Sequence, residues 1–384
     1  MKHCAAVIMC ILCLTVWAFA EETRILMDCS VNGQSVQFMF DTGAEGPMLF
    51  RKTAGRLNLT IDEPPDDVVV EPGKMKAGFT EPCRFQLIEG GTESEITFAV
   101  VDIPEFLNTD IEGILGWGGL KHNLVEINPS LKKAMIRTSL DFDKDQWMCL
   151  DIRTDLNILV VKTASQNSTD DLLLIDTGSS NGLTVGKQLW PLLTDDETNQ
   201  KRTLLSVYYP SAGLIVEDEM WVQKMDFGEL SFSQIPVTRG LEAHIWLTNE
   251  NVDGILGMWG ISCYQWIIDG PAGKIYYKQN DLIRIPQTYD YNRLGAVFVP
   301  EDVQTTNELI AHVIKDGPAW RAGIRDGDEL LKIGSLDATK WRTDPDVMPL
   351  SQYWERPAGT IIDLVLLRDG EQKKIAVRLE EIFK

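Results

Sequence analysis

The chain has few basic residues and few histidines for its length. Of its 384 residues, 36 are Lys or Arg and 57 are Asp or Glu, which gives a formal net charge of −21. Nucleic-acid binders and proteins that dock on anionic membranes need a basic face, so the composition argues against both classes. The four histidines stand at positions 3, 122, 244 and 312, and this spacing argues against a His-rich metal site. The sequence therefore predicts no metal, no other cofactor and no nucleic-acid partner.

Long apolar runs are absent after the first twenty residues. Residues 1–20 combine a short basic start, an apolar stretch from Cys4 to Trp17 and the small-residue sequence Ala18-Phe19-Ala20, which is the pattern of a signal peptide. The apolar stretch is short for a bilayer-spanning helix, and an uncleaved anchor is the alternative. We therefore expect an exported protein, periplasmic or secreted, with no transmembrane span after cleavage of residues 1–20.

Cysteine is scarce once residues 1–20 are removed. Cys29, Cys83, Cys149 and Cys263 remain, and an even number of cysteines in an oxidising compartment allows disulfides. Their wide spacing matches neither a redox Cys-x-x-Cys motif nor a zinc site. The sequence leaves open both their pairing and the alternative of free buried thiols.

Helical periodicity is also scarce. Short β-branched and aromatic runs dominate instead, and they are broken by Gly, Pro, Asn and Asp. This pattern predicts a mainly β fold. The predicted strands include residues 24–29, 36–40, 68–70, 96–101, 158–161, 172–175, 220–222 and 274–277, and the predicted short helices are residues 320–324 and 351–354.

An internal repeat covers most of the chain. An apolar strand runs into Asp-Thr-Gly at Asp41 and again at Asp176, 135 residues later. The Ile of a Gly-Ile-Leu-Gly segment follows 73 residues after the first Asp and 79 residues after the second. We therefore predict two similar units at residues 21–142 and 143–280, a linker at 281–292 and a third unit at 293–384.

Two Asp residues at strand ends, each before a glycine turn, are suited to acid–base hydrolysis. Two carboxyl groups about 3 Å apart cannot both ionise easily, so they share one proton over a wide pH range. The ionised group then acts as a base toward a bound water, and the protonated group acts as an acid toward a carbonyl oxygen. This hydrolyses an amide without a covalent intermediate or a metal. The alternative is that each Asp only caps its turn.

Residues 22–280 resemble a fused pair of retropepsin-like aspartic protease units, related to the two lobes of pepsin-type enzymes. The two Asp-Thr-Gly turns and the two Ile-Leu-Gly segments carry the resemblance. It implies two pseudo-symmetric β-barrel units, an endopeptidase acting on peptide or unfolded protein substrates, and a catalytic dyad of Asp41 and Asp176. The supporting residues that it implies are Thr42, Gly43, Ala44, Thr177, Gly178 and Ser179 in the turns, and Ile114, Leu115, Gly116, Ile255, Leu256 and Gly257 packed against them.

The two turns differ at the position after Asp-Thr-Gly, where the first has Ala44 and the second has Ser179. A Ser179 hydroxyl that bonds Asp176 would favour the charged form of that carboxyl group. We therefore predict an asymmetric dyad in which Asp176 ionises more readily. The resemblance also implies hairpin flaps over the substrate near residues 70–78 and 208–216.

A competing motif overlaps the second turn. Residues 178–182 read Gly-Ser-Ser-Asn-Gly, which matches the nucleophile elbow of α/β-hydrolases. That fold needs alternating helices and strands, with an acid and a His after the Ser. His244 and His312 are the His candidates and lack such context, so we favour the aspartic reading.

From residue 293 the sequence resembles a PDZ domain of the type found in bacterial envelope proteases. Gly-Pro-Ala at 317–319, Ala-Gly-Ile at 322–324 and Gly-Asp at 327–328 carry the resemblance. It implies a bacterial protein and a β-sandwich with short helices, which adds a peptide strand to its sheet and holds the C-terminal carboxylate of the peptide on backbone N–H groups. The alternative is a domain that only packs on the protease. The loop assigned to peptide binding is Leu294, Gly295, Ala296 and Val297.

These features together predict an exported aspartic endopeptidase with a peptide-binding module. One alternative is a peptide-binding protein built on protease lobes that no longer cut. Another keeps the activity but pairs units between two chains. The sequence leaves open the cleavage specificity and the oligomeric state.

Overall fold

The structure is a computed structural model, and it describes residues 24–63, 78–88, 93–102, 110–164, 171–194, 201–209, 213–244, 247, 249–280, 289–303, 306–344 and 346–383. The predicted signal peptide, the predicted strand 68–70, the predicted flap tips and most of the predicted linker lie outside these residues. The described helices have at most six residues, while strands are numerous, which confirms the predicted mainly β fold. No helix in the described ranges has the length and apolarity needed to cross a bilayer.

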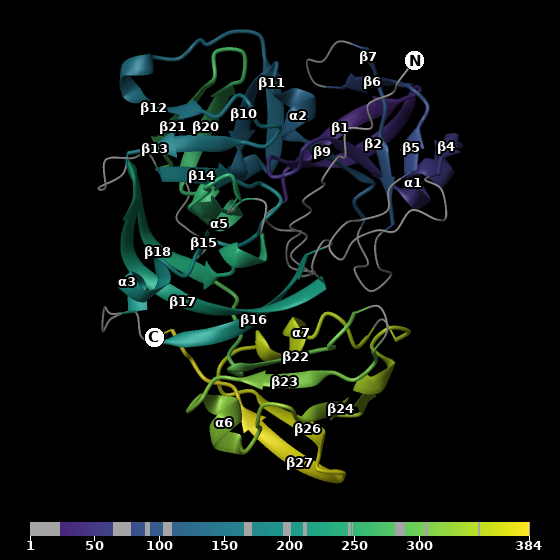
Figure 1. The fold of residues 1–384 in the computed structure, drawn as a ribbon, viewed down its shortest axis with the longest axis vertical. Helices are drawn as coiled ribbons and strands as arrows, with labels where there is room; N and C mark the ends of the chain where they lie inside the picture. Colours follow the sequence, from purple (N-terminus) through teal and green to yellow (C-terminus); the bar gives the residue numbers. More distant parts are fainter. Residues whose placement is uncertain are drawn as a thin grey trace.

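The first part of the chain, through residue 137, folds around the first Asp-Thr-Gly turn (Figure 1). Its elements are β1 (Leu26–Val31), β2 (Gln34–Asp41), β3 (Pro47–Phe50), α1 (Arg51–Arg56), β4 (Ile61–Asp62), β5 (Gly78–Thr80), β6 (Cys83–Leu87), β7 (Ser94–Ile96), β8 (Ala99–Val101), β9 (Gly113–Gly116), α2 (Trp117–Leu120), β10 (Leu124–Asn128) and β11 (Lys133–Arg137).

Strand β9 lies between the two strands that flank the first turn. β2 pairs with β9 in parallel, with Asp41 opposite Gly116. β3 pairs with the same strand in the antiparallel direction, with Pro47 opposite Leu115. The first Ile-Leu-Gly segment is therefore hydrogen-bonded directly beside the strand that ends in Asp41.

The next part of the chain repeats this arrangement around the second turn. Its elements are β12 (Met148–Ile152), β13 (Val160–Thr163), β14 (Asp171–Ile175), β15 (Leu183–Val185), α3 (Trp190–Thr194), β16 (Arg202–Tyr209), β17 (Gly213–Phe227), β18 (Leu230–Arg239), β19 (Gly254–Leu256), α5 (Met258–Ile261), β20 (Tyr264–Asp269) and β21 (Lys274–Gln279). β14 pairs with β19 in parallel, with Ile175 opposite Leu256, and β15 pairs with β19 in the antiparallel direction.

Pairing between β10 and β20 joins the two parts into one sheet, which has 21 strands in the described residues. Leu124 lies opposite Asp269, and the antiparallel ladder continues to Ile127 and Trp266. Ile127 and Trp266 are both buried and belong to one apolar core that contains side chains from both parts. The two Asp turns are therefore held in a common framework.

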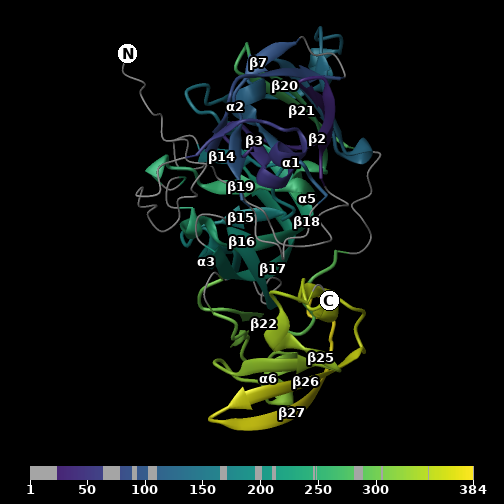
Figure 2. The same ribbon diagram turned by 90° about the vertical axis from the view of Figure 1, so that its right-hand side faces the viewer.

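The C-terminal unit is a separate antiparallel sheet with its own core, which includes Phe298, Trp341 and Trp354. It lies next to the hairpin of β16 and β17, as Figures 1 and 2 show from two directions. The limits of this unit as a domain, residues 293–384, remain a prediction from the sequence. Its elements are β22 (Ala296–Val299), β23 (Ile310–Val313), α6 (Pro318–Ala322), β24 (Glu329–Ile333), β25 (Leu336–Asp337), α7 (Ser351–Trp354), β26 (Ile361–Arg368) and β27 (Glu371–Arg378).

The sequence left open whether the four cysteines form disulfides, and the structure shows no disulfide among them. Cys29, Cys83, Cys149 and Cys263 are all free thiols. Cys29 and Cys83 are buried in the first apolar core, Cys263 is half-buried and Cys149 is exposed. The fold of the described residues therefore holds together without a disulfide.

Candidate active site

Asp41 and Asp176 occupy equivalent positions in the two related parts of the chain. Asp41 is the last residue of β2, Asp176 follows the last residue of β14, and each is only 1% exposed. The peptide N–H of Gly43 donates to Oδ1 of Asp41 at 2.9 Å, and the N–H of Gly178 donates to Oδ1 of Asp176 at 2.9 Å. Each turn therefore fixes its carboxyl group by the same bond.

The two carboxyl groups lie against each other's glycine. A Cβ atom added to Gly43 would stand 2.7 Å from Cγ of Asp176, and one added to Gly178 would be closer still to Cγ of Asp41. Both distances are too short for a real side chain, so only glycine leaves room for the opposite carboxyl group. The two groups are close enough for each to shift the pKa of the other, and a proton shared between them would form a hydrogen bond. The structure thus brings the two predicted catalytic residues together.

Beneath the carboxyl groups, the two threonines link the turns. The peptide N–H of Thr42 donates to Oγ1 of Thr177, and the N–H of Thr177 donates to Oγ1 of Thr42, both at 3.0 Å. The Thr42 hydroxyl donates to the carbonyl of Ile175 at 2.5 Å, and the Thr177 hydroxyl donates to the carbonyl of Phe40 at 2.6 Å. This network connects each turn to the strand that carries the other Asp.

The two Ile-Leu-Gly segments pack behind the turns. The peptide N–H of Asp176 donates to the carbonyl of Leu256 at 2.8 Å. A Cβ atom on Gly116 would stand 2.5 Å from the carbonyl oxygen of Ala44, so this glycine permits close packing on the first turn. All six residues of the two segments are buried, namely Ile114, Leu115, Gly116, Ile255, Leu256 and Gly257.

Burial raises the pKa of both carboxyl groups. It raises the pKa of Asp176 to about 6. It raises the pKa of Asp41 well above its usual range, and the neighbouring negative charge of Asp176 raises it further. Oδ2 of Asp41 is buried and has no hydrogen-bond partner within the described residues, which a proton shared with Asp176 would provide. The pair therefore favours one proton near neutral pH, with Asp176 the more readily ionised member.

The sequence predicts that a Ser179 hydroxyl bond makes Asp176 the more readily ionised group. The structure has this asymmetry, but its cause is not the Ser179 hydroxyl. Against the effect of burial, the bonds that lower the Asp176 pKa come from the peptide N–H of Gly178, the Asp41 side chain and the peptide N–H of Ser179. The first turn provides matching N–H groups from Gly43 and Ala44. Because the backbone bonds match, the two carboxyl groups differ through their mutual charge and hydrogen bond.

The hairpin of β16 and β17 contains the described part of the second predicted flap. Tyr209 pairs with Gly213 at the ends of its two strands. The β16–β17 hairpin follows β15 in the chain, just as β4 and β5 follow β3 in the first part. β4 and β5 also pair with each other. The hairpin therefore occupies, in chain order, the position that the predicted first flap occupies.

The predicted peptide-binding loop belongs to the C-terminal unit and not to the site of the two Asp residues. Leu294, Gly295, Ala296 and Val297 are all buried at the start of β22. Their important neighbour is Asn292, whose Oδ1 accepts the peptide N–H groups of Leu294 at 2.9 Å and Gly295 at 3.3 Å. Sequence reasoning missed Asn292, although Asn side chains often bond backbone N–H groups two residues ahead.

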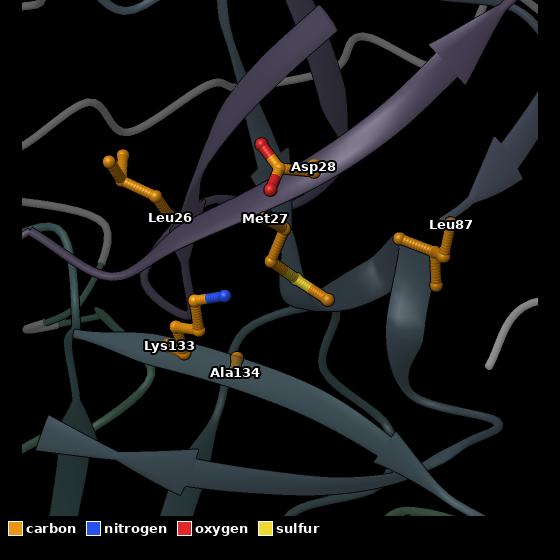
Figure 3. Close-up of a pocket in the computed structure, with 6 residues that line it drawn as sticks. All are labelled: Leu26, Met27, Asp28, Leu87, Lys133 and Ala134. Carbon is orange, nitrogen blue, oxygen red and sulfur yellow. The ribbon is translucent and has the colours of Figure 1, made fainter. Parts of the chain in front are cut away.

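A small surface hollow in the first part of the chain contains none of the predicted site residues. Figure 3 shows it between β1 and β11, with Asp28 and Lys133 among its lining. Its other lining residues are Leu26, Met27, Leu87 and Ala134. A search of the described residues also found no group of three or more His, Cys, Asp or Glu side chains that could hold a metal ion.

Comparison with known families gives an independent result for the first part of the chain. Residues 27–118 match a family described as aspartyl protease. The matched range runs from β1 into α2 and includes Asp41, its turn and the first Ile-Leu-Gly segment. This part of the chain is therefore similar to an aspartyl protease domain.

Proposed function

We propose, from the aspartyl protease domain at residues 27–118, that the protein is an aspartic endopeptidase with a dyad of Asp41 and Asp176. The observation that supports this most strongly is the approach of the two buried carboxyl groups, each against the other's glycine. The first domain provides only one of them. Residues 143–280 therefore act as the second protease unit, and the active site is complete within one chain.

The dyad hydrolyses a peptide bond by moving protons between its two carboxyl groups and the substrate. Ionised Asp176 takes a proton from a bound water, whose oxygen attacks the carbonyl carbon, while protonated Asp41 gives its proton to the carbonyl oxygen. As the tetrahedral intermediate collapses, Asp41 takes a proton from one of its two hydroxyl groups, the C–N bond breaks, and the leaving nitrogen takes the proton held by Asp176. Asp41 is then protonated and Asp176 ionised, as at the start. The threonine network holds the two carboxyl groups in place during these steps.

The remaining parts of the chain fit an exported protease that acts on peptides or unfolded proteins. The first twenty residues act as an export signal, which places the protein in a bacterial periplasm or outside the cell. The hairpin of β16 and β17 covers the substrate. The C-terminal unit is a PDZ module that receives a peptide C-terminus at Leu294, Gly295, Ala296 and Val297.

The test is cleavage of unfolded casein by the purified chain from residue 21, with and without pepstatin. We expect cleavage that pepstatin stops and that Asp41→Asn removes. Absence of cleavage from about pH 4 to 8, with peptide binding retained, would show a binding protein built on protease lobes. Activity that falls on dilution would show that the dyad forms between chains.

A further inference from the structure

The C-terminal unit docks on the hairpin of β16 and β17. β16 and β17 both lie against β22, as Figures 1 and 2 show. Leu214 of the hairpin packs against the apolar core of the C-terminal unit. Trp221 of β17 packs on the ring of Tyr289 at 5.6 Å and on the ring of Phe383 at 6.2 Å. This contact joins the second part of the chain to the segment just before the C-terminal unit and to the end of that unit.

The docked strand β22 is an edge strand of the described C-terminal sheet. An edge strand is a ready template for pairing with another peptide. Here all four residues of β22 are at most 6% exposed. Ala296 and Phe298 belong to the core of the C-terminal unit, and β16 lies against the strand. The edge that would receive a peptide is therefore covered by the protein's own hairpin.

Asn292 makes the central polar contact of this interface, and it is 5% exposed. Its Nδ2 donates to the carbonyl of Leu204 in β16 and to the carbonyl of Ala296, both at 2.8 Å. The backbone carbonyl of Asn292 accepts a hydrogen bond from the Thr203 hydroxyl at 2.6 Å. Asn292 thus holds β16 through both its side chain and its backbone.

The Oδ1 atom of the Asn292 side chain occupies a site that is suited to an anion. Its Oδ1 accepts the successive peptide N–H groups of Leu294 and Gly295, and Gly295 has a φ of +68°. Successive N–H groups that converge in this way form a nest, which binds anions and can capture the carboxylate at the end of a peptide. The Asn292 oxygen therefore stands where one oxygen of such a carboxylate would be held.

We propose that Asn292 is a latch that a peptide C-terminus opens. A carboxylate that takes the N–H groups of Leu294 and Gly295 displaces the Asn292 amide, breaks its bond to Leu204 and releases β16 from the C-terminal unit. The proposal rests on the proposed function in two respects: a peptide C-terminus binds the C-terminal unit, and the hairpin of β16 and β17 covers the dyad. The latch itself rests on the contacts of Asn292.

The first test is hydrogen–deuterium exchange of the amides of β16 in the full chain. All variants carry Asp41→Asn, so that hydrolysis plays no part and a failure of the proposed function leaves this test intact. Asn292→Ala removes the side-chain bonds of Asn292 to Leu204 and to the N–H groups of Leu294 and Gly295. We expect exchange in β16 to become about tenfold faster, because the loss of one buried hydrogen bond has about this effect. Asn157→Ala is the control, because Asn157 is exposed and its side chain bonds Lys121 of the first part of the chain. Unchanged exchange in Asn292→Ala would overturn the latch.

The second test separates the two ends of the latch. Asn292→Asp keeps an acceptor for the Leu294 and Gly295 N–H groups but cannot donate to Leu204. In this variant we expect faster exchange in β16, while the new carboxylate at position 292 still occupies the N–H groups of Leu294 and Gly295.

Peptide binding is measured with a pool of random decapeptides that have an apolar last residue, made with a free carboxylate or with a C-terminal amide. The free-acid pool should bind Asn292→Ala at least about tenfold better than Asn292→Asp, and the amidated pool should bind neither. Equal binding to both variants, or no binding of the free-acid pool to Asn292→Ala, would overturn the proposal.

Discussion

Thr42 and Thr177 each donate a peptide N–H to the other's hydroxyl oxygen, at 3.0 Å in both directions. Both residues are buried, at 0% and 2% exposure, and they are 135 residues apart in the chain. Their hydroxyl groups bond the carbonyls of Ile175 and Phe40, so each threonine also reaches across to the opposite strand. The position of each Asp carboxyl group is therefore set by both halves of the sheet.

Removing one of these hydroxyl groups should destabilise the fold. Thr42→Val keeps the shape of the side chain but leaves the Thr177 N–H and the Ile175 carbonyl without their buried partner. We expect a loss of about 1–3 kcal/mol in the free energy of unfolding, measured by urea denaturation. Thr42→Ser is the matched control because it keeps the hydroxyl group. Equal stability of the two variants would show that the network has no such role.

Each Asp of the pair should be indispensable for hydrolysis. Asn cannot take or release the shared proton, so Asp41→Asn and Asp176→Asn should both reduce kcat by at least about a thousandfold. Asp141→Asn is the control, because Asp141 is exposed and follows β11, outside both Asp-Thr-Gly turns. Near-full activity in either dyad variant would contradict a shared dyad.

The glycines after the threonines should tolerate no side chain. In Gly43→Ala, the new Cβ would meet the Asp176 carboxyl group at 2.7 Å and push it away from Asp41. We expect a loss of kcat of about a hundredfold or more, since small displacements of catalytic groups have such effects. Gly46→Ala is the control in the same turn, because its Cβ would have no neighbour within 4 Å. Equal kcat values for the two variants would contradict this geometry.

The sequence predicted the mainly β fold and the pairing of the two Asp turns because both depend on local patterns that occur twice. It failed where strand partners lie far away in the chain. Residues 96–101 were expected as one strand, but β7 ends at Ile96 and pairs with β6, while β8 begins at Ala99 and pairs with β3 and β5. The predicted strand at 220–222 is only the middle of β17, which extends from Gly213 to Phe227 because it has β16 and β18 as partners.

Side-chain roles were harder to predict than strands. The sequence suggested a Ser179 hydroxyl bond to Asp176, but the structure provides peptide N–H groups for both carboxyl groups, and any residue type has these. Asn292 was missed for a related reason. Its bonds to Leu204 and Thr203 cross between two units, and no local motif encodes such a contact.

Hydrolysis should be fastest near neutral pH and should weaken in acid. Asp176, with a pKa of about 6, must be ionised to accept a proton, so kcat/KM should fall about tenfold per pH unit below about 6. Asp41, with a pKa raised well above its usual range by burial and by the charge of Asp176, keeps its proton at higher pH. A pH profile of casein cleavage measures this. A maximum at pH 3 to 4 would contradict the assignment of the more readily ionised group.

The interface between the hairpin and the C-terminal unit contains one buried acid, Glu219, and one half-buried acid, Glu355. Glu219 of β17 is 2% exposed and accepts a bond from the Tyr289 hydroxyl. Burial raises its pKa from 4.5 to about 8, against the lowering effect of that bond and with a further rise from Glu217. Burial likewise raises the pKa of Glu355 to about 8, with further rises from Asp290 and Glu219 and a lowering by Arg293.

Raising the pH should therefore weaken this interface. Between pH 4.5 and about 8 the folded protein keeps a proton on Glu219 that the unfolded chain has lost, so the free energy of unfolding falls as the pH rises through that window. Glu219→Gln removes this contribution, and Glu355 keeps its own. We expect urea midpoints of the wild type to fall between pH 5 and 8, and those of Glu219→Gln to fall less. The exposed Glu371 provides the control variant Glu371→Gln, which should follow the wild type. If Glu219→Gln showed the full wild-type slope, the Glu219 carboxyl group would have to be ionised in the docked form.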